Sequence, residues 1–497
     1  MTQDQVDGKL DKRRKGVYGP PMGKKCVVLV DDLNMPSKEV YGAQPPIELL
    51  RQFMDYQGWY GRDNVFRHLV DVQFVAAMGP PGGGRTFITN RYLRHFSTVG
   101  VVQTSEQTLK TIFNTILSWH LGTKGFPEQV AALCPKVIDA TLDVYRAAMK
   151  SLLPTPTKSH YTFNLRDFAR VVAGIMMMPA SVLPESSAEA TGSYKRLFVH
   201  EIFRVFYDRL VDDKDRAWLM NLVKGVVLRF FGDNFDTLFA HLAGDDAGRV
   251  IDVEDMRRLF FGQFLQSAAE PAERQYQEIM DASRAIAVMD EYLMDHNGTS
   301  KRPMNLAMFL FAVEHVSRIC RVLAQPGGHM LLVGVGGSGR QSLTRLAAFI
   351  CGMEVVQVEI SKSYTKVEWR EDLKRLLRRS GGEYKHVVFL FSDTQIKDES
   401  FVEDINNILN SGEVPNMFPS DERMQILEMV RPAAAKRKLE TPLELWGFFT
   451  EMVSADGRRL SDSVSFLGGR PRLPSASAVP QLLPHRAVHV AHRWGLP

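Results

Sequence analysis

The sequence has few of the features that mark secreted, membrane or metal-binding proteins. It contains only four cysteines, and their spacing matches neither a disulfide framework nor a metal-ligand pattern: Cys26, Cys134, Cys320 and Cys351. The longest apolar run, residues 171–183, is too short for a membrane span and contains Pro179. The N-terminus lacks the apolar core of a signal peptide. We therefore expect a cytoplasmic chain with no metal site and no membrane partner.

The sequence also has little excess charge. It has 61 Lys and Arg residues against 57 Asp and Glu residues, a net charge of +4 over 497 residues. This balance gives no reason to expect nucleic acid as a partner. Hydrophobic residues make up 45% and charged residues 24%, which is typical of globular protein, and the length allows two to four domains.

The first hundred residues show an α/β pattern. Residues 26–30 and 72–78 are apolar runs that predict strands buried on both faces of a parallel sheet. Residues 40–70, between them, have the composition of a helical segment with aromatic anchors. Strand, helix and strand in this order predict an α/β module.

From about residue 105 to 320 the pattern is largely helical. Thr104 or Ser105 can cap a first helix, and residues 164–168 open an amphipathic one. After that the α/β pattern returns, with a strand at 330–333 and two further strands at 355–360 and 387–391. We interpret the chain as two α/β regions joined by helices.

A glycine-rich loop follows the strand at 330–333 and opens a helix, which is the context of a P-loop. Glycines allow backbone N–H groups to approach phosphate oxygens, and the helix N-terminus adds positive potential. The alternative is a glycine-rich turn that binds no ligand. Because the loop lies between a strand and a helix, we favour phosphate binding. The candidate cofactor-binding residues are Gly334, Val335, Gly336, Gly337, Ser338, Gly339, Arg340, Gln341 and Ser342.

This loop departs from the usual pattern at two positions. Arg340 stands where a Lys is usual, and its bulkier, forked guanidinium need not reach the same phosphates. Gln341 replaces the hydroxyl that normally meets Mg²⁺, and Ser342 comes one residue late. The strand at 387–391 ends in Ser392 and Asp393, where a hydrolytic site uses Asp and Glu. We predict a module that holds nucleotide with little hydrolysis.

In the first region the strand at 26–30 is followed by Asp31, at the position of a metal-associated carboxylate, and Asp32, where a Glu is usual. Alone this signal is weak, because strands often end in acidic loops. Arg91 and Arg94 are candidates for arginines supplied to a neighbouring γ-phosphate. The alternative is surface salt bridging, and on spacing alone we favour it.

Taken together, these motifs resemble the AAA+ modules of axonemal dynein heavy chains. Residues 19–25, 30–36 and 41–50 resemble the third module, and residues 334–342, 392–396 and 410–415 resemble the fourth. The resemblance covers roughly residues 5–452. It implies P-loop AAA+ folds, each a parallel sheet flanked by helices, joined by largely α-helical lid and connecting segments.

The resemblance also assigns residues. Asp31 and Asp32 correspond to the third module's Walker B pair, and Asp393 to a degenerate Walker B position of the fourth. Arg91 and Arg94 lie in an arginine-finger segment, and Arg166 matches a lid sensor. Gly79 stands where a sensor Asn is expected.

The implied domains divide the chain into five parts. They are 1–104, the C-terminal part of the third module's large domain; 105–225, its helical lid; 226–324, a helical connection and the start of the fourth module; 325–452, an incomplete P-loop core of the fourth module; and 453–497, a divergent tail expected to be disordered. In this interpretation the chain is an internal fragment, beginning after one P-loop and ending before the next lid.

The resemblance implies part of an ATP-binding, minus-end-directed microtubule motor of the ciliary axoneme. It implies ATP or ADP as cofactor, with weaker support for Mg²⁺, and other dynein heavy, intermediate and light chains as partners. Microtubules are expected to bind only regions outside this chain. The rival hypothesis is a non-enzymatic assembly or interaction piece of the dynein complex. A third hypothesis is a stand-alone P-loop enzyme such as a nucleotide kinase. Such an enzyme needs the P-loop Lys and Mg²⁺ ligand, and this sequence shows neither.

Overall fold

The computed structural model describes residues 2–61, 63–81, 85–243, 249–300, 302–334, 337–454, 465–468 and 487–491, the last two and Ser454 by their backbone. The chain divides into two compact units. The first unit is Met1–Gln103 with Glu413–Asp421, and the second is Thr104–Gly412 with Glu422–Pro497. The finer domain boundaries expected from the sequence stay predictions.

The first unit contains two small sheets. One has the order β1-β2-β5-β4, and the other is the parallel pair β3 and β6. The elements are α1 (Thr2–Asp7), β1 (Asp11–Arg14), β2 (Val17–Gly19), β3 (Cys26–Val30), α2 (Pro45–Tyr56), β4 (Gly58–Tyr60), β5 (Phe66–Leu69), β6 (Val72–Ala76) and α3 (Asn90–Leu93).

Two sequence predictions in this unit are wrong. The helix expected over 40–70 ends at Tyr56, because Gln57 takes the left-handed conformation with φ 55°, and β4 and β5 follow. The β3 strand is buried on one face only. Val28 packs toward the core beneath α2, whereas Val27 and Leu29 are 62% and 68% exposed.

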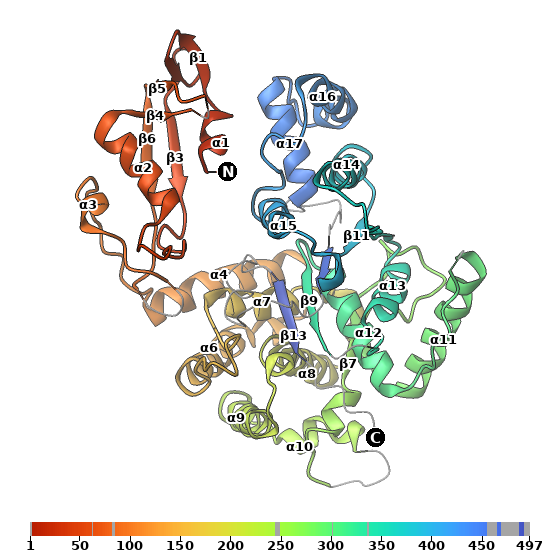
Figure 1. The fold of residues 1–497 in the computed structure, drawn as a ribbon. Helices are drawn as coiled ribbons and strands as arrows, with labels where there is room; N and C mark the ends of the chain where they lie inside the picture. The colour runs from red at the N-terminus through yellow and green to blue at the C-terminus, as the bar shows by residue number, and fades with distance from the viewer. Residues whose placement is uncertain are drawn as a thin grey trace. The chain divides into compact units, whose positions relative to one another are not determined.

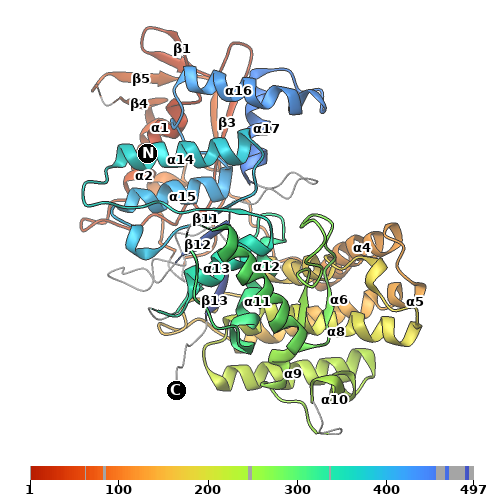
Figure 2. The same cartoon turned by 90° about the vertical axis from the view of Figure 1, so that its right-hand side faces the viewer.

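The second unit begins with a helical bundle, drawn in orange to yellow-green in Figure 2. Ser105 caps its first helix by accepting a hydrogen bond from the Thr108 N–H, as the sequence predicts. Asn164 with Asp167 forms a capping box at the start of α7, where the sequence predicts a helix to begin. The helices are α4 (Glu106–Thr123), α5 (Glu128–Ala131), α6 (Cys134–Ser151), α7 (Leu165–Ile175), α8 (Ser187–Val205), α9 (Asp213–Phe231) and α10 (Phe235–Leu238), with short turns η1 (Ala180–Val182), η2 (Tyr207–Arg209), η3 (Ala240–Leu242) and η4 (Asp255–Arg258).

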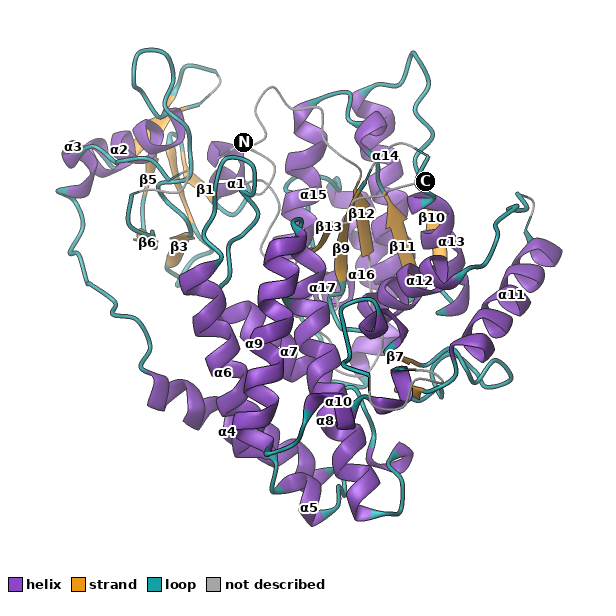
Figure 3. Cartoon of the chain, turned by 90° about the horizontal axis from the view of Figure 1, so that it is seen from below, coloured by secondary structure: helices purple, strands orange, loops and turns teal. Residues whose placement is uncertain are grey.

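The rest of the second unit is an α/β domain around a parallel sheet with the order β10-β11-β12-β9-β13 (Figures 1 and 3). The elements are β7 (Phe260–Gly262), β8 (Gln277–Ile279), α11 (Ala282–Thr299), α12 (Leu310–Leu323), β9 (His329–Val333), α13 (Arg340–Ile350), β10 (Glu354–Val356), α14 (Lys366–Leu377), η5 (Arg378–Gly382), β11 (Val387–Leu390), η6 (Asp393–Gln395), α15 (Glu399–Ser411), α16 (Ser420–Ala435), α17 (Pro442–Ser454), β12 (Ser465–Gly468) and β13 (Ala487–Ala491).

Helices cover both faces of this sheet. On β11, Val388 and Leu390 pack into the cluster formed with α12 and α13, while Phe389 contacts Trp369 of α14 on the other side. The strand is therefore buried on both faces, as its apolar run predicts. The strand expected at 355–360 is shorter and starts earlier, since β10 ends at Val356.

Two short segments of the predicted tail, 453–497, join this sheet by backbone pairing. β12 lies between β11 and β9, and β13 pairs with the other edge of β9, all in parallel. The rest of that tail beyond Ser454 lies outside the described residues.

Candidate functional site

The predicted P-loop lies between β9 and α13. Gly337 and Gly339 have φ angles of 81° and 71°, in the left-handed region that favours glycine. Gly339 is the N-cap of α13, and no side chain caps the helix's first N–H groups. Free N–H groups at the start of an eleven-residue helix suit an anion. Val335 and Gly336, also predicted phosphate ligands, lie outside the described residues.

Two polar atoms of this loop are left without partners. Ser338 is only 9% exposed, and its Oγ has no hydrogen-bond partner among the described residues. The same holds for Nη1 of Arg340, whose side chain is half-buried. A buried donor left unpaired costs about 1–3 kcal/mol, so both atoms fit a phosphate group as the missing partner. Gln341 is exposed and Ser342 is half-buried on the first turn of α13.

The residues expected to handle the metal and water are engaged in local hydrogen bonds. Ser392 is buried, and its N–H donates to Gln395 Oε1 at 2.7 Å while its Oγ lies 3.1 Å from the same oxygen. The Gln395 amide in turn donates to the Val358 carbonyl. Asp393 Oδ1 accepts the Thr394 N–H at 3.0 Å. Ser392 therefore works as a capping residue that ties the end of β11 to the segment after β10.

The sheet brings these two groups to one edge. Because β9 and β11 both run parallel to β12, the P-loop and Ser392 both follow the carboxyl ends of their strands. Ligands of open α/β sheets bind outside this edge. The arrangement provides a phosphate cradle, positive charge at Arg340, and a single carboxylate at Asp393 where a hydrolytic site has two.

In the first unit, the acidic pair is held by an arginine that the sequence interpretation missed. Asp32 has φ 48° and accepts from Arg85 Nη2 at 2.8 Å, while Asp31 accepts the Asp32 N–H at 2.9 Å. The Arg85 guanidinium packs directly over Gly79, since an added Cβ would lie 2.2 Å from Arg85 Nη1 and the side chain would have to shift. Asn34, 0% exposed, donates to the Gly79 carbonyl at 2.8 Å. The sequence signal that could have indicated this contact is the position of Arg85 directly after a glycine-rich turn.

The three predicted arginines differ in their surroundings. Arg94 pairs with Asp55 at 3.0 Å, which is the surface salt bridge that spacing alone favours. Arg91, on α3, and Arg166, on the first turn of α7, are exposed, and neither has an ion pair among the described residues. Their assigned roles in a nucleotide site stay predictions.

A buried ionic cluster between α8 and α12 was also missed. We call Glu201, Arg321, His200 and Tyr276 the Glu201 cluster. Arg321 Nε lies 3.1 Å from both carboxylate oxygens of Glu201, which also accept from Tyr276 at 3.2 Å and lie 3.0 Å from His200 Nδ1. Burial opposes the charge of Glu201, but Arg321 outweighs it and lowers the pKa of Glu201 to about 2. The sequence does not indicate this cluster, because Arg321 and Tyr276 are 120 and 75 positions from Glu201.

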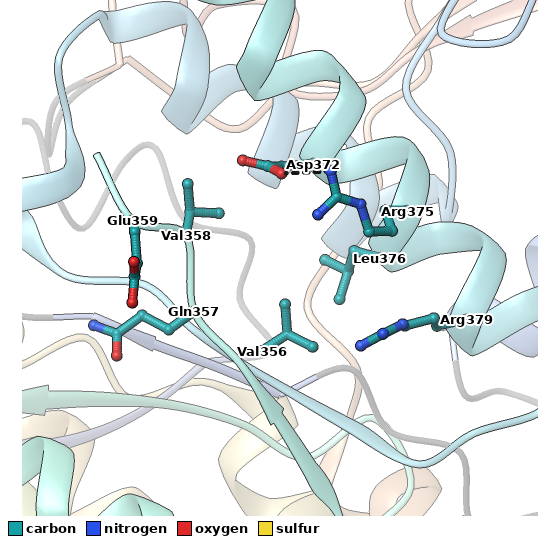
Figure 4. A pocket seen from close by; sticks show the side chains of 8 residues that line it. All are labelled: Val356, Gln357, Val358, Glu359, Asp372, Arg375, Leu376 and Arg379. Carbon is teal, nitrogen blue, oxygen red and sulfur yellow. Dashed lines mark ion pairs between the residues drawn. The ribbon is translucent and has the colours of Figure 1, made fainter. Parts of the chain in front are cut away.

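A small pocket lies where the chain leaves β10, next to α14. It has a volume of about 280 Å³, and Figure 4 shows Asp372 and Arg375 of α14 and Arg379 of η5 on one side, with Gln357 and Glu359, which follow β10, on the other. It shares no residue with the P-loop. Arg375 already pairs with Asp372 at 3.3 Å, so the pocket does not carry the functional assignment.

The described residues contain no helix long and apolar enough to cross a membrane. They also contain no group of three or more His, Cys, Asp or Glu side chains that could hold a metal ion.

Comparison with protein families identifies the same regions. Residues 304–456 match the family described as the P-loop containing dynein motor region D4, and residues 1–104 match the P-loop containing dynein motor region. Residues 137–240 match the AAA+ lid domain.

Curated proteins give consistent matches. The chain is 49% identical over 91% of its length to mouse (Mus musculus) dynein axonemal heavy chain 3, and 48% identical over 91% to the human (Homo sapiens) protein of that name. It is 43% identical over 92% of its length to mouse dynein axonemal heavy chain 1. The chain spans about a tenth of these relatives, since the matches cover 11%, 11% and 10% of their lengths.

Proposed function

This chain belongs to the dynein heavy chain family, and from that premise we propose that it forms a nucleotide-holding part of an axonemal microtubule motor. The phosphates bind at the loop between β9 and α13, and hydrolysis there is slow or absent. The observation that carries this proposal is the pair of unpartnered polar atoms, Ser338 Oγ and Arg340 Nη1, at the uncapped start of α13.

Each side chain of the loop has a distinct part in this binding. Arg340 supplies a fixed positive charge that can reach two phosphate oxygens through its fork. Ser338 Oγ donates one hydrogen bond from a buried position, and the first N–H groups of α13 add more. A nucleoside triphosphate or diphosphate, ATP or ADP, has the required phosphates. The loop residues contact phosphate rather than base, so they do not select between the two.

Weak metal handling supports the second part of the proposal. Ser392 has no carboxylate, and its hydroxyl is engaged with Gln395 and Thr394. Asp393 alone then has to hold Mg²⁺ and orient water, two tasks that hydrolytic P-loop sites divide between two acids. We therefore expect nucleotide binding that depends only weakly on Mg²⁺.

At the level of the whole protein, the axonemal relatives support assignment to the cytoskeleton of the cilium. There, the chain contributes to an ATP-driven, minus-end-directed motor and assembles with other dynein heavy, intermediate and light chains. Microtubule contacts are assigned to parts of the relatives outside the matched span. Arg91, Arg94 and Arg166 act at nucleotide sites shared with neighbouring modules.

A second candidate function is that of a non-enzymatic interaction piece. The exposed apolar face of β3 and β6 favours it, since Val27, Leu29 and Val75 are 62%, 68% and 45% exposed. Contiguous apolar surface of this kind usually serves association. Concentration-dependent self-association that persists in saturating ATP, without nucleotide binding, is the result that selects this function.

The test is a titration of a fluorescent ATP analogue against the wild type, Arg340→Ala and Arg375→Ala, each with Mg²⁺ and with EDTA. Arg375 is an exposed arginine of the same unit outside the P-loop and serves as the matched control. We expect Arg340→Ala to weaken binding about 10- to 100-fold, Arg375→Ala to leave it unchanged, and EDTA to change it by less than about threefold. Equal affinity of all three proteins, or no binding to the folded wild type, contradicts the proposal.

A further inference from the structure

Two cysteines that are 31 positions apart in the sequence meet between α12 and α13. Cys320 is on α12 and Cys351 is the C-cap residue of α13, and both are free. The Cys351 Sγ lies 4.0 Å from the Cys320 carbonyl oxygen, and the Cys320 Sγ lies 3.9 Å from the Ala347 carbonyl on α13. Each sulfur therefore lies against the backbone of the helix that carries the other cysteine. This proximity is absent from the sequence pattern, which spaces all four cysteines widely.

The two thiols are unequal. Cys320 is 2% exposed, and contact with Cys351 together with burial raises its pKa well above the ordinary range. Cys351 is half-buried and reachable from solvent. Reactive cysteines are those whose thiolate is accessible, so Cys351 reacts first and Cys320 second.

A positive charge lies beside this pair. Arg274 donates from Nη1 to the carbonyl of Ile350, the residue before Cys351, at 2.6 Å and from Nε to the Ala269 carbonyl at 2.9 Å. Its guanidinium is 5.5 Å from the ring of Tyr292, whose hydroxyl donates to Phe264. Arg274 is thus held at both ends beside Cys351. Its charge lowers the pKa of Cys320 and so offsets part of the rise caused by Cys351 and burial.

We propose that Cys320 and Cys351 form a reversible disulfide that links α12 to the end of α13, with Cys351 as the peroxide-reactive thiol and Cys320 as the resolving thiol. The other two cysteines, Cys26 and Cys134, have no part in it. The proposal concerns a modification site and does not depend on the proposed nucleotide function.

The oxidant is hydrogen peroxide, and the reaction balances in two steps. The Cys351 thiolate attacks one peroxide oxygen, the O–O bond breaks, and hydroxide leaves to take up the released proton as water. This gives a sulfenic acid at Cys351. The Cys320 thiolate then attacks that sulfur, the S–S bond forms, and the S–O bond breaks with loss of a second water. A small thiol such as glutathione reverses the bridge by two exchange steps and is itself oxidised to a disulfide.

The bridge ties together two helices with different roles. α12 carries Arg321 of the Glu201 cluster, and α13 begins at the P-loop. A covalent link between them fixes two helices on the same face of the α/β domain's sheet. We therefore expect the oxidised chain to unfold at a higher temperature than the reduced chain, as cross-links that close a loop generally do.

The test is mass spectrometry of the folded chain after treatment with hydrogen peroxide and quenching with an alkylating agent. A protease that cuts after glutamate releases residues 315–354 as one peptide, because no acidic residue interrupts it. This peptide holds Cys320 and Cys351 and no other cysteine. We expect it to lose two hydrogens, to take up no alkyl group, and to regain two alkyl groups after glutathione treatment.

Variants separate the proposed order from chance oxidation. Cys351→Ser is expected to leave Cys320 reduced and alkylated on denaturation, whereas Cys320→Ser is expected to stop at the sulfenic or sulfinic acid of Cys351. Cys134→Ser is the matched control and should bridge at the wild-type rate. Arg274→Gln should slow bridging severalfold while leaving the product unchanged.

Two results overturn the proposal. One is that the peptide still takes up two alkyl groups after peroxide treatment of the folded wild type. The other is that bridging occurs only in denaturant, with the folded chain accumulating sulfinic acid at Cys351 instead.

Discussion

The P-loop and the Glu201 cluster are both buried polar sites of the second unit, yet they differ in how far their hydrogen bonds are satisfied. In the Glu201 cluster, Arg321, His200 and Tyr276 all engage the same carboxylate. At the P-loop, Ser338 Oγ and Arg340 Nη1 have no partner among the described residues.

This difference indicates that the Glu201 cluster contributes to stability and the P-loop to ligand binding. A buried charge with all its partners inside the protein fixes the relative position of the elements that supply them. A buried donor with no partner costs stability until a ligand supplies the missing acceptor. The first kind of site should therefore respond to mutation through unfolding, and the second through affinity. The predictions below test this contrast, beginning with the largest effect.

Arg321→Met should destabilise the second unit by about 3–5 kcal/mol, because it leaves Glu201 charged and unpaired at 0% exposure. Urea unfolding followed by far-UV circular dichroism measures the change. The double variant Glu201→Met with Arg321→Met should recover most of the loss, since paired apolar replacement of a buried ion pair is often neutral. Equal losses in the single and double variants would show that the ion pair itself, rather than an orphaned charge, is what matters.

Acidification should weaken the same cluster by roughly 2–3 kcal/mol between pH 6.5 and 4. Burial lowers the pKa of His200 to about 4, below its ordinary value of 6.5, so the folded state resists the proton that the unfolded chain accepts. The stability is complete above pH 6.5 and is lost as the pH falls toward 4. Glu201, with its pKa near 2, extends the loss below about pH 4.5.

The measurement is the urea midpoint as a function of pH for the wild type and His200→Gln. The variant should have a shallower slope between pH 6.5 and 4. Some slope should remain, because burial also holds the pKa of His315 well below its usual value. Superimposable slopes for the two proteins contradict the role given to His200.

The sequence predicted the regular parts of both sites better than their contacts. Local signals sufficed for the strand, glycine turn and helix around Arg340, and for the cap at Ser105 and the helix start at residues 164–168, because each depends on neighbours within a few residues. Glu201 and Arg321 are 120 positions apart, and no local pattern connects them. The role of Gly174 is equally hidden in the sequence. An added Cβ at this position would lie 1.7 Å from Glu201 Oε2, a residue on another helix.

The burial of the strand at 26–30 and the contact of Arg85 with Asp32 could not be predicted, because both depend on parts of the fold that are distant in the sequence. The run at 26–30 is as apolar as the one at 387–391, but only the latter has helices on both faces, so Val27 is exposed and Phe389 is buried. Arg85 escaped notice because its partner Asp32 is 53 residues away across a turn.

Ser338→Ala should cost no folding stability and is expected to raise it by up to about 1 kcal/mol, since it removes an unpaired buried hydroxyl. The same change should weaken nucleotide binding by about 3- to 10-fold. Thermal unfolding without nucleotide and the fluorescent titration measure the two effects. Ser317→Ala is the matched control, because Ser317 is buried but donates to the Glu314 carbonyl at 2.9 Å and should lose stability instead.

Ser392→Asp has the smallest expected effect and probes the missing carboxylate directly. It should make nucleotide binding depend on Mg²⁺ by an additional two- to fivefold, because an acid at the end of β11 lies on the same sheet edge as the P-loop. Ser392→Asn, of similar size but uncharged, is the control, and titrations with Mg²⁺ and with EDTA give the comparison.

The gain is limited by the local role of Ser392. Its hydroxyl lies 3.1 Å from Gln395 Oε1, so a carboxylate there faces a carbonyl oxygen and cannot donate to it. The Gln395 amide is already committed to the Val358 carbonyl, which blocks a simple flip. Combining Ser392→Asp with Gln395→Ala should therefore increase the Mg²⁺ dependence beyond that of Ser392→Asp alone. If the double variant gains nothing, the loss of metal handling at this edge lies in Gln341 rather than in Ser392.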